Sequence, residues 1–261
     1  MPISHPEPSS VQHASAFEVV VATQDVRLHD EAKQLKQVIG KQNRPTTFIV
    51  YFGQGGVEIR RSNKADKKGH KVDFNTIDRR TGAGNLSRKQ LFPRAIGNET
   101  KTVLDITAGL GSDSAMLALM GYTVRAVERS PIISVLLRDG LHRANKNPEL
   151  HNALGGRLAL AEADSRVIMQ NIDLVDVVYM DPMFPPKRKK SALPQGSIQM
   201  LQAVVGYDDD VQTKELFDLA MNAATKRVVV KRPNYAPFFR ENPTFVHKGK
   251  LVRYEVYGTQ K

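Results

Sequence analysis

Two segments of the chain carry residues whose types and spacing could do chemistry. Residues 103–113 read Val-Leu-Asp-Ile-Thr-Ala-Gly-Leu-Gly-Ser-Asp, an apolar run that breaks into a glycine turn where a helix should begin. Residues 181–186 read Asp-Pro-Met-Phe-Pro-Pro and follow a second apolar run, residues 175–180. Ligands of open α/β sheets bind outside the carboxyl ends of the strands. We therefore expect a cofactor at the first segment and a planar amine presented to it by the second.

The first segment predicts an adenosine-binding site. Gly109 and Gly111 let the backbone turn tightly and approach a ligand, although Ser114 replaces the third glycine of a dinucleotide motif. Asp105 ends the apolar run, and its carboxylate can orient the turn or meet an ammonium group. The next apolar run ends at Glu128. An acid there accepts hydrogen bonds from ribose hydroxyls, whereas a solvated surface acid is the alternative interpretation.

Asp113 favours S-adenosylmethionine over a nicotinamide dinucleotide. This acid lies in the first turn of the predicted helix, where it would repel the phosphates that a dinucleotide places at a helix N-terminus. S-adenosylmethionine has no phosphate. A third apolar run ends at Asp164, whose carboxylate can accept a hydrogen bond from the adenine amine, cap the following helix, or do both.

The second segment has the groups that methylation of an exocyclic amine needs. Because the lone pair of such an amine is conjugated with the base, transfer requires an acceptor for the N–H that also stabilises the growing positive charge. Asp181 supplies a carboxylate, the carbonyl of Pro182 could supply a second acceptor, and Phe184 offers a ring for a flipped base. An ordinary proline-rich turn with a core phenylalanine is the alternative.

Basic residues near the same edge predict contact with RNA. Four cations follow the amine segment directly: Lys187, Arg188, Lys189 and Lys190. They could bind phosphates that flank the target base, although such a run alone is usually a solvated loop. A later strand should bring Lys231, Arg232 and Tyr235 to the same rim. The formal net charge of +11 also favours a polyanionic partner, with a merely basic enzyme as the alternative.

Five blocks, in order, resemble the bacterial small-subunit ribosomal RNA methyltransferase J family. They are Asp105-x-Thr-Ala-Gly-Leu-Gly, Val127-Glu-Arg-Ser-Pro131, Asp181-Pro-Met-Phe-Pro-x-Lys, Lys190-Ser-Ala-Leu193 and Lys226-Arg-Val-Val-Val-Lys-Arg-Pro-x-Tyr-Ala-Pro237. The resemblance implies methylation of N2 of one guanosine in 16S rRNA with S-adenosylmethionine. It also implies cofactor contacts at Ser112, Asp113, Glu128, Arg129, Asp164, Ser165 and Asp181. Ser112 stands where the family often has arginine.

The elements that position these residues alternate from residue 102 onward. Strands are predicted at 102–106, 123–127, 157–162, 175–180, 227–231, 244–247 and 253–257, and helices at 112–120, 131–145, 166–172, 197–205 and 211–224. This alternation predicts an α/β fold with a doubly wound, mostly parallel sheet, the Rossmann-like sheet of a class I S-adenosylmethionine-dependent methyltransferase. The last two strands are too close for a crossover helix and should form an antiparallel hairpin.

A small basic α+β domain is expected before this sheet. Its strands are predicted at 17–22, 46–52, 57–60 and 71–74, with a helix at 29–39 and a hairpin turn at 53–56. A helix ending at Ile96 should be capped by Asn85 or Ser87. We thus expect a disordered segment 1–15, a small domain 16–97 and a methyltransferase domain 98–261.

Composition excludes several other classes. The chain has 261 residues and no cysteine, so disulfides, thiolate metal sites and cysteine nucleophiles are excluded, which fits a reducing cytoplasm. No signal-peptide pattern and no apolar run near ~20 residues occurs, so no membrane partner is expected. Because the sulfonium charge of the cofactor disappears in the transition state, we expect no metal. The expected partner is 16S rRNA or the small ribosomal subunit.

Three other functions fit parts of the pattern. The Asp181 segment also resembles the Asp/Asn-Pro-Pro-Tyr/Phe motif of DNA adenine or cytosine amino-methyltransferases, and a labelled-methyl assay on rRNA, small subunits and DNA separates the two. A noncatalytic RNA-binding ribosome assembly factor would not need the intact glycine turn, Glu128 and Asp181. A nicotinamide oxidoreductase would be stabilised against heat by NAD and not by S-adenosylmethionine.

Overall fold

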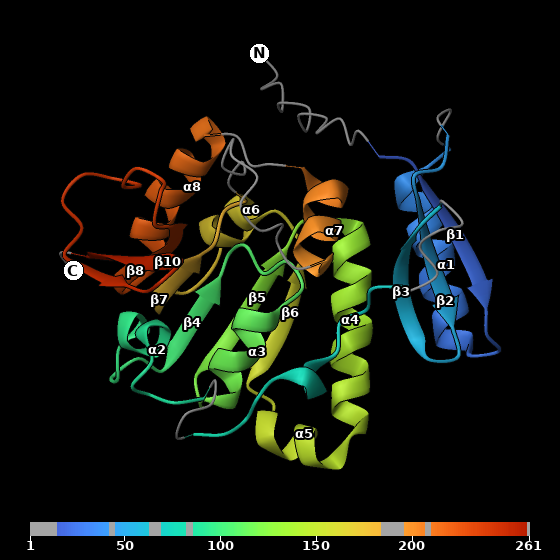
Figure 1. Cartoon of the computed structure of the whole chain (residues 1–261), viewed down its shortest axis with the longest axis horizontal. Helices are drawn as coiled ribbons and strands as arrows, with labels where there is room; N and C mark the ends of the chain where they lie inside the picture. The colour runs from blue at the N-terminus through green and yellow to red at the C-terminus, as the bar shows by residue number, and fades with distance from the viewer. Residues whose placement is uncertain are drawn as a thin grey trace.

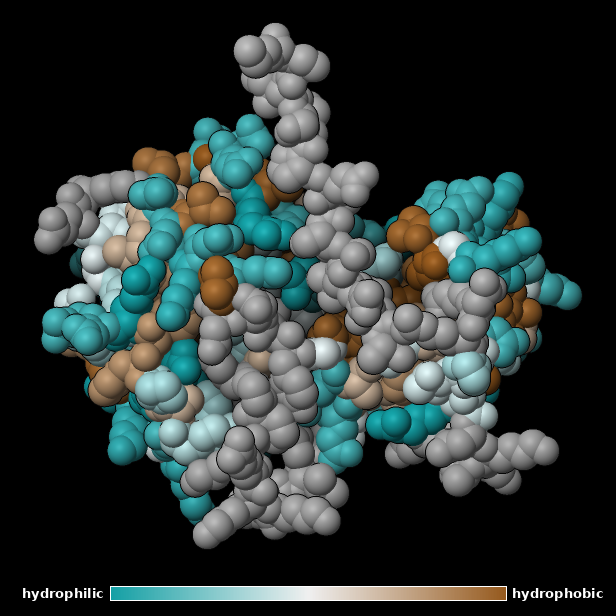
Figure 2. Space-filling model, turned by 90° about the horizontal axis from the view of Figure 1, so that it is seen from above, coloured by the Kyte–Doolittle hydropathy of each residue, from teal (hydrophilic) through white to brown (hydrophobic). Residues whose placement is uncertain are grey.

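Two sheets organise the protein in a computed structural model, which describes residues 15–41, 45–62, 69–81, 86–183, 196–206 and 210–259. A three-stranded sheet lies near the N-terminus and a seven-stranded sheet follows from residue 102 (Figure 1). Seen from above, they form a smaller and a larger lobe, both with many hydrophilic side chains on the surface (Figure 2).

The small sheet has the order β1-β2-β3. It consists of β1 (Phe17–Ala22), β2 (Phe48–Gly53) and β3 (Gly56–Arg61). β1 and β2 are parallel, because α1 (Val26–Ile39) crosses over between them. β2 and β3 are antiparallel and meet at the glycine turn, which confirms the predicted hairpin.

The large sheet has the order β6-β5-β4-β7-β8-β10-β9. Its strands are β4 (Thr102–Asp105), β5 (Thr123–Glu128), β6 (Leu158–Glu162), β7 (Val175–Met180), β8 (Ala224–Pro233), β9 (Phe245–Lys248) and β10 (Val252–Gly258). Strands β6 to β8 are parallel neighbours, and β10 is antiparallel to both β8 and β9. The predicted Rossmann-like sheet and its final hairpin are confirmed.

Helices cover both faces of the large sheet. They are α2 (Leu91–Ile96), α3 (Ser112–Leu119), α4 (Pro131–Lys146), α5 (Pro148–Leu154), α6 (Ser165–Gln170), α7 (Gly196–Val205) and α8 (Asp210–Ala223). Neighbouring strand residues face opposite cores: Val177 packs with the side of α3 and α4, and Val178 with the side of α6 and α8. This alternation explains why β7 is apolar at residues 177–180 and β8 at residues 228–230, on both faces of the sheet. In the part of the chain that the structure describes, no helix is both long and apolar enough to cross a bilayer.

The secondary structure between the two sheets, and after α4, differs from the prediction. Residues 71–74 do not form a strand; Val72 and Phe74 are buried, and a 3₁₀ helix spans Phe74–Thr76. α2 begins after Gln90 and not at a Ser87 cap, while Asn85 lies outside the described residues. α5 was not predicted, although Asn147 caps it and proline follows at its first position.

The helix α4 joins the two sheets. Asp139 of α4 is fully buried and accepts hydrogen bonds from the Val57 backbone N–H (2.9 Å), Arg143 Nε (2.8 Å) and Arg27 Nη2 (3.1 Å). Gly56 has a φ of 104°, and a Cβ there would collide with the Asp139 carboxylate. The glycine turn of the small sheet is therefore fitted to α4.

The division into domains at residue 97 stays a prediction. The ring of Phe92 in α2 lies 4.8 Å from the Tyr179 ring and 5.1 Å from the Tyr254 ring, centroid to centroid, so α2 packs with the large sheet. This packing favours a boundary before α2. The segment 1–15, predicted to be disordered, lies outside the described residues except for Ser15.

Candidate functional site

The turn after β4 depends on two glycines. Gly109 and Gly111 have φ angles of 54° and 74°, in the left-handed region that residues with a Cβ rarely adopt. A Cβ on Gly111 would also lie 2.5 Å from Cδ1 of Leu137 in α4, and one on Gly109 would lie 3.3 Å from Cδ2 of Leu201 in α7. Glycine is thus needed at both positions on conformational grounds and at Gly111 on steric grounds too.

Asp105, at the end of β4, is hydrogen-bonded to residues of this turn and of the helix that follows it. Its carboxylate accepts hydrogen bonds from the Thr107 backbone N–H (3.1 Å) and from Ser114 Oγ (2.5 Å), and the residue is 1% exposed. The pKa of Asp105 is raised to about 7. Burial is the largest cause, the carboxylates of Asp113 and Asp181 act in the same direction, and the two hydrogen bonds oppose them. Of the two roles predicted for Asp105, orientation of the turn is the one that these bonds support.

Glu128 ends β5 and faces the same turn. Its Oε2 accepts a hydrogen bond from the Gly109 backbone N–H (2.9 Å), and its Oε1 accepts one from the Ser130 backbone N–H (2.7 Å). With 9% exposure, Glu128 is not a solvated surface acid. Each carboxylate oxygen has a further lone pair that can accept a hydrogen bond, and the contact with ribose hydroxyls stays a prediction.

A cluster of charges lies where β4, β7 and β8 end. Lys231 Nζ is 2.9 Å from Oδ2 of Asp113 and 2.9 Å from Oδ2 of Asp181. Tyr179 donates its hydroxyl hydrogen to Asp113 Oδ2 (2.5 Å), and the Asp181 backbone N–H donates to Thr107 Oγ1 (2.7 Å). The structure thus brings together residues that are as much as 118 positions apart in the sequence.

The members of this cluster stabilise each other's charged forms. Burial lowers the pKa of Lys231, but the carboxylates of Asp181 and Asp113 outweigh it and raise that pKa well above its usual value. Burial raises the pKa of Asp113, but the Lys231 ammonium and the Tyr179 hydroxyl outweigh it and lower that pKa. Lys231 is thus a cation shared by both carboxylates.

Two more predicted cofactor residues lie after β6. Asp164 caps α6 by accepting a hydrogen bond from the Arg166 backbone N–H (2.8 Å), and the Arg166 side chain also pairs with it (2.6 Å). The predicted cap is confirmed, and the contact with adenine stays a prediction. Ser165 is buried and donates its hydroxyl hydrogen to the Ile106 carbonyl (2.6 Å). That bond ties the start of α6 to the end of β4.

The remaining site residues differ in accessibility. Ser112 and Arg129 are exposed beside the turn, and Pro182 is buried. Tyr235 is 48% exposed, in agreement with a place on the rim. Arg232, by contrast, is 7% exposed and its Cζ lies 5.3 Å from the centroid of the Phe239 ring. Arg232 was expected on the rim as an RNA contact, but its side chain is buried and its charge does not face solvent. Phe184 and the cations at 187–190 lie outside the described residues.

The sequence did not predict the carboxylate partners of Lys231 or the aromatic residues near it. The sequence predicts an RNA contact for that lysine, whereas the structure places its ammonium between two carboxylates. Tyr254 pairs with it across β10 and β8, and Phe92 stacks between Tyr254 and Tyr179. One signal was available for Tyr179, because a tyrosine in a buried strand needs a partner for its hydroxyl.

The chain is similar to known methyltransferases. Residues 28–259 match the family model described as "Putative SAM-dependent methyltransferase". A Photobacterium profundum protein named ribosomal RNA small subunit methyltransferase J is 43% identical over 245 residues, covering 87% of this chain and 93% of the relative. A Coxiella burnetii protein of the same name is 38% identical over 235 residues, covering 87% and 89%. The crystal structure of a SAM-dependent methyltransferase from Neisseria gonorrhoeae matches with a TM-score of 0.66 and 27% identity, covering 94% and 96%.

The residues of the site fit S-adenosylmethionine, the cofactor of the matched family. The turn has no Cβ at Gly109 or Gly111, so a ligand can approach its backbone closely. Glu128 has carboxylate oxygens beside that turn, and oxygens of this kind accept hydrogen bonds from ribose hydroxyls. Asp113 and Asp181 provide carboxylates near the strand ends, the group that pairs with an ammonium or a sulfonium, and Lys231 provides the group that pairs with a carboxylate.

Proposed function

Because this chain belongs to the ribosomal RNA small subunit methyltransferase J family, we propose that it transfers a methyl group from S-adenosylmethionine to N2 of a guanosine in 16S rRNA. Family membership excludes the nicotinamide oxidoreductase considered above. The proposed substrate is naked 16S rRNA or the small subunit, and the proposed location is the cytoplasm.

One observation carries this proposal: Asp181 is held rigidly beside the cofactor turn. Its backbone N–H is bonded to Thr107, which belongs to the turn after β4, and its carboxylate is bonded to Lys231 at the end of β8. Two anchors from neighbouring strands therefore fix the direction of the carboxylate before any substrate binds. Such preorganisation is what stabilises a charge that develops only in the transition state.

The bound cofactor supplies an electrophilic methyl group on a sulfonium. Asp181 accepts a hydrogen bond from the N2 amine, which draws the amine lone pair toward the methyl group and stabilises the positive charge that grows on nitrogen. The carbonyl of Pro182 is the proposed second acceptor. Lys231 keeps the Asp181 carboxylate in place and balances part of its charge. Transfer would form the bond between N2 and the methyl carbon as the methyl–sulfur bond breaks, leaving a neutral thioether, and the nitrogen would then lose a proton to solvent.

The proposed RNA contacts are Lys187, Arg188, Lys189, Lys190 and Tyr235, with Phe184 as the ring under the flipped guanine. Tyr235 is the described member of this set and is exposed on the rim. Cations at such a position would bind the phosphates on either side of the target nucleotide and position it.

The test is transfer of labelled methyl from S-adenosylmethionine to 16S rRNA, small subunits and DNA, with nucleoside analysis of the product. We expect N2-methylguanosine in rRNA and no label in DNA. The matched control is Asp181→Asn, which keeps the shape of the side chain. Label in adenine or cytosine of DNA would instead support the DNA amino-methyltransferase alternative. Mapping the methylated nucleotide in rRNA from a deletion strain identifies the guanosine.

A further inference from the structure

In the part of the chain that the structure describes, no helix covers one face of the small sheet. Side chains alternate between the two faces of a strand. In β2, Phe48, Val50 and Phe52 are fully buried with the side chains of α1, whereas Ile49 and Tyr51 point to the other face and remain partly exposed. Figure 1 shows α1 on one side of this sheet. Tyr51 thus sits on the central strand of an open face.

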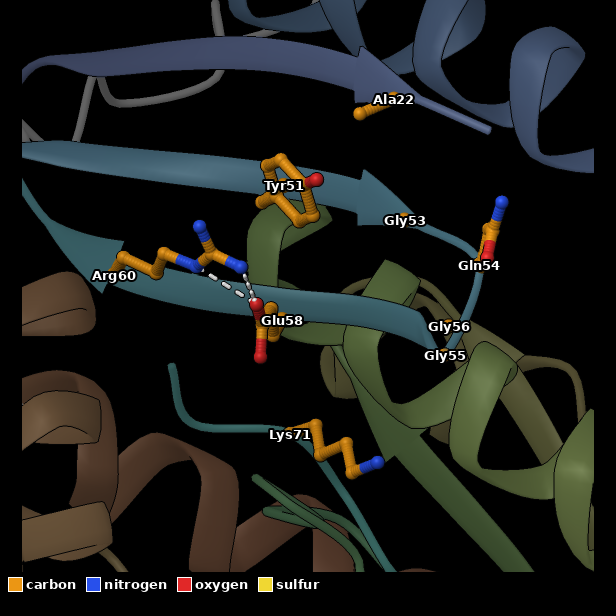
Figure 3. Close-up of a pocket in the computed structure, with 9 residues that line it drawn as sticks. All are labelled: Ala22, Tyr51, Gly53, Gln54, Gly55, Gly56, Glu58, Arg60 and Lys71. Carbon is orange, nitrogen blue, oxygen red and sulfur yellow. Dashed lines mark hydrogen bonds and ion pairs between the residues drawn. The ribbon is translucent and has the colours of Figure 1, made fainter. Parts of the chain in front are cut away.

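A hollow of about 460 Å³ lies on this face (Figure 3). Tyr51 lines it from the central strand, Glu58 and Arg60 line it from β3, and the turn 53–56 closes one end. Lys71 lines it from the segment beyond β3, where His70 forms an antiparallel bridge with Ile59. Tyr51 and Arg60 are drawn in front of their strands in this view, and Lys71 lies on the segment on the other side of β3 from Tyr51.

The hollow contains a prearranged flat platform. Arg60 Cζ lies 3.9 Å from the centroid of the Tyr51 ring. Glu58 Oε1 accepts hydrogen bonds from Arg60 Nε (2.7 Å) and from Arg60 Nη2, which fixes the plane of the guanidinium. Gly53 lets the ring lie against the backbone, because a Cβ there would be 2.5 Å from Tyr51 Cε1, and a Cβ on Gly69 would collide with the Glu58 carboxylate.

The chemistry of this platform matches single-stranded RNA. Aromatic rings and arginine planes stack with unpaired bases, and an aromatic on the central strand of an open sheet is a common arrangement in RNA-binding domains. Lys71 is exposed and supplies a cation for phosphate. The sequence from 60 to 71 contains six lysines and arginines and one acidic residue, Asp66. This charge complements a polyanion and disfavours an apolar protein partner.

We propose that the open face of the small sheet binds a single-stranded segment of the substrate RNA, with a base stacked on the Arg60–Tyr51 platform and its phosphate beside Lys71. This inference rests on the proposed function, because the segment belongs to the same rRNA that carries the target guanosine. The face contributes to substrate affinity and not to the chemical step. It gives the small sheet a role that the cofactor and amine sites do not explain.

The test measures binding of a short fluorescein-labelled oligoadenylate to the full-length protein by anisotropy. Tyr51→Ala should raise the Kd about tenfold, within the range for loss of one base–aromatic stack, whereas Tyr51→Phe keeps the ring and should stay within about twofold. Lys71→Ala should lower the slope of log K against log salt by somewhat under one unit. Lys33→Ala, an exposed lysine on α1 behind the sheet, is the matched control and should change neither value.

Methyl transfer to 16S rRNA tests RNA binding by the small sheet separately from the proposed methyltransferase function. Tyr51→Ala should raise KM for rRNA and leave kcat and S-adenosylmethionine affinity unchanged. If wild-type protein methylates rRNA and Tyr51→Ala retains its KM and oligonucleotide affinity, the sheet-face site is overturned and the proposed function stands. If wild-type protein transfers no methyl to rRNA, the proposed function fails instead. Weaker binding to assembled subunits with unchanged binding to the oligonucleotide would assign the face to a ribosomal protein and overturn RNA binding.

Discussion

The carboxyl edge of the large sheet and the open face of the small sheet use the same types of residue in opposite ways. At the edge, Lys231 is bonded to two carboxylates and packed among aromatic rings. On the open face, Arg60 is bonded to one carboxylate and lies on Tyr51 beside solvent. The two regions are similarly exposed, since the side chains of the Lys231 pairs are 22–37% exposed and those of the Arg60–Glu58 pair are 33% and 22% exposed. They differ in their partners: one ammonium shared by two carboxylates fixes several strand ends together at the edge, whereas a single ion pair, which contributes little stability, holds the guanidinium against a ring on the open face.

The largest expected effect concerns the charge of Asp181. Asp181→Asn keeps the shape but replaces the anion with a neutral amide, and removal of one preorganised electrostatic interaction lowers rates by about 10²–10³. Single-turnover methyl transfer with both substrates saturating measures this effect, because saturation compensates for any decrease in cofactor or RNA affinity. Near-normal turnover would leave Asp181 as a binding residue only.

Removal of Lys231 should break the rigidity of the same edge. Lys231→Met leaves Asp113 and Asp181 without their shared cation, and because the three side chains are partly exposed, we expect the free energy of unfolding to fall by about 2 kcal/mol, within the range for hydrogen bonds to charged groups. Urea denaturation measures this change. Lys71→Met on the open face is the control and should change stability by less than about 0.5 kcal/mol. Equal effects of the two substitutions would contradict the comparison.

Glu128 should affect the cofactor more than the fold. Glu128→Ala should weaken S-adenosylmethionine binding by about 1.5–3 kcal/mol, the range for hydrogen bonds to a charged group. Because the carboxylate also accepts from Gly109 and Ser130, this variant loses some stability too, and Glu128→Gln is the matched control that retains one acceptor oxygen. Titration calorimetry at a temperature where both variants are folded checks the prediction, and unchanged affinity in Glu128→Ala would remove ribose binding from this residue.

Asp105 predicts a pH dependence of stability. Burial raises its folded pKa to about 7, above the ordinary value of 3.8, so folding favours the protonated carboxyl. Its contribution to stability is complete below about pH 4 and is lost as the pH rises toward and through 7. The free energy of unfolding of wild type relative to Asp105→Asn should therefore fall between pH 4 and pH 7. A difference that stays constant over this range would show that Asp105 is ionised in the folded protein at all these pH values.

The smallest effects should come from cations of the RNA surface. Neutralising Lys187, Arg188, Lys189 and Lys190 together should weaken RNA binding, and each phosphate that is no longer neutralised should lower the slope of log K against log salt by somewhat under one unit. Affinity for S-adenosylmethionine should not change. An unchanged slope would mean that these side chains are solvated and do not touch phosphate.

Much of the large sheet could be predicted because its signals are local. The strand at 175–180 was predicted with its observed bounds, since a run that is apolar except for Asp176 ends in an acid and a proline. The glycine turn followed from Gly109 and Gly111, whose backbone conformation few other residues adopt. The segment 71–74 was predicted wrongly, because Val72 and Phe74 are buried by packing against α4 and not by a strand partner.

The sequence by itself therefore determined the strands of the large sheet, the glycine turn after the first of them, and the place of Asp181 at a strand end. Only the tertiary structure decided the partners of long charged side chains. Lys231 and Arg232 are neighbours in the sequence, yet they point to opposite faces of β8, one to a pair of carboxylates and the other to Phe239. The physical reason is that a side chain's partners are set by which strands lie beside its own, and that pairing joins residues too far apart in the chain for local patterns to specify.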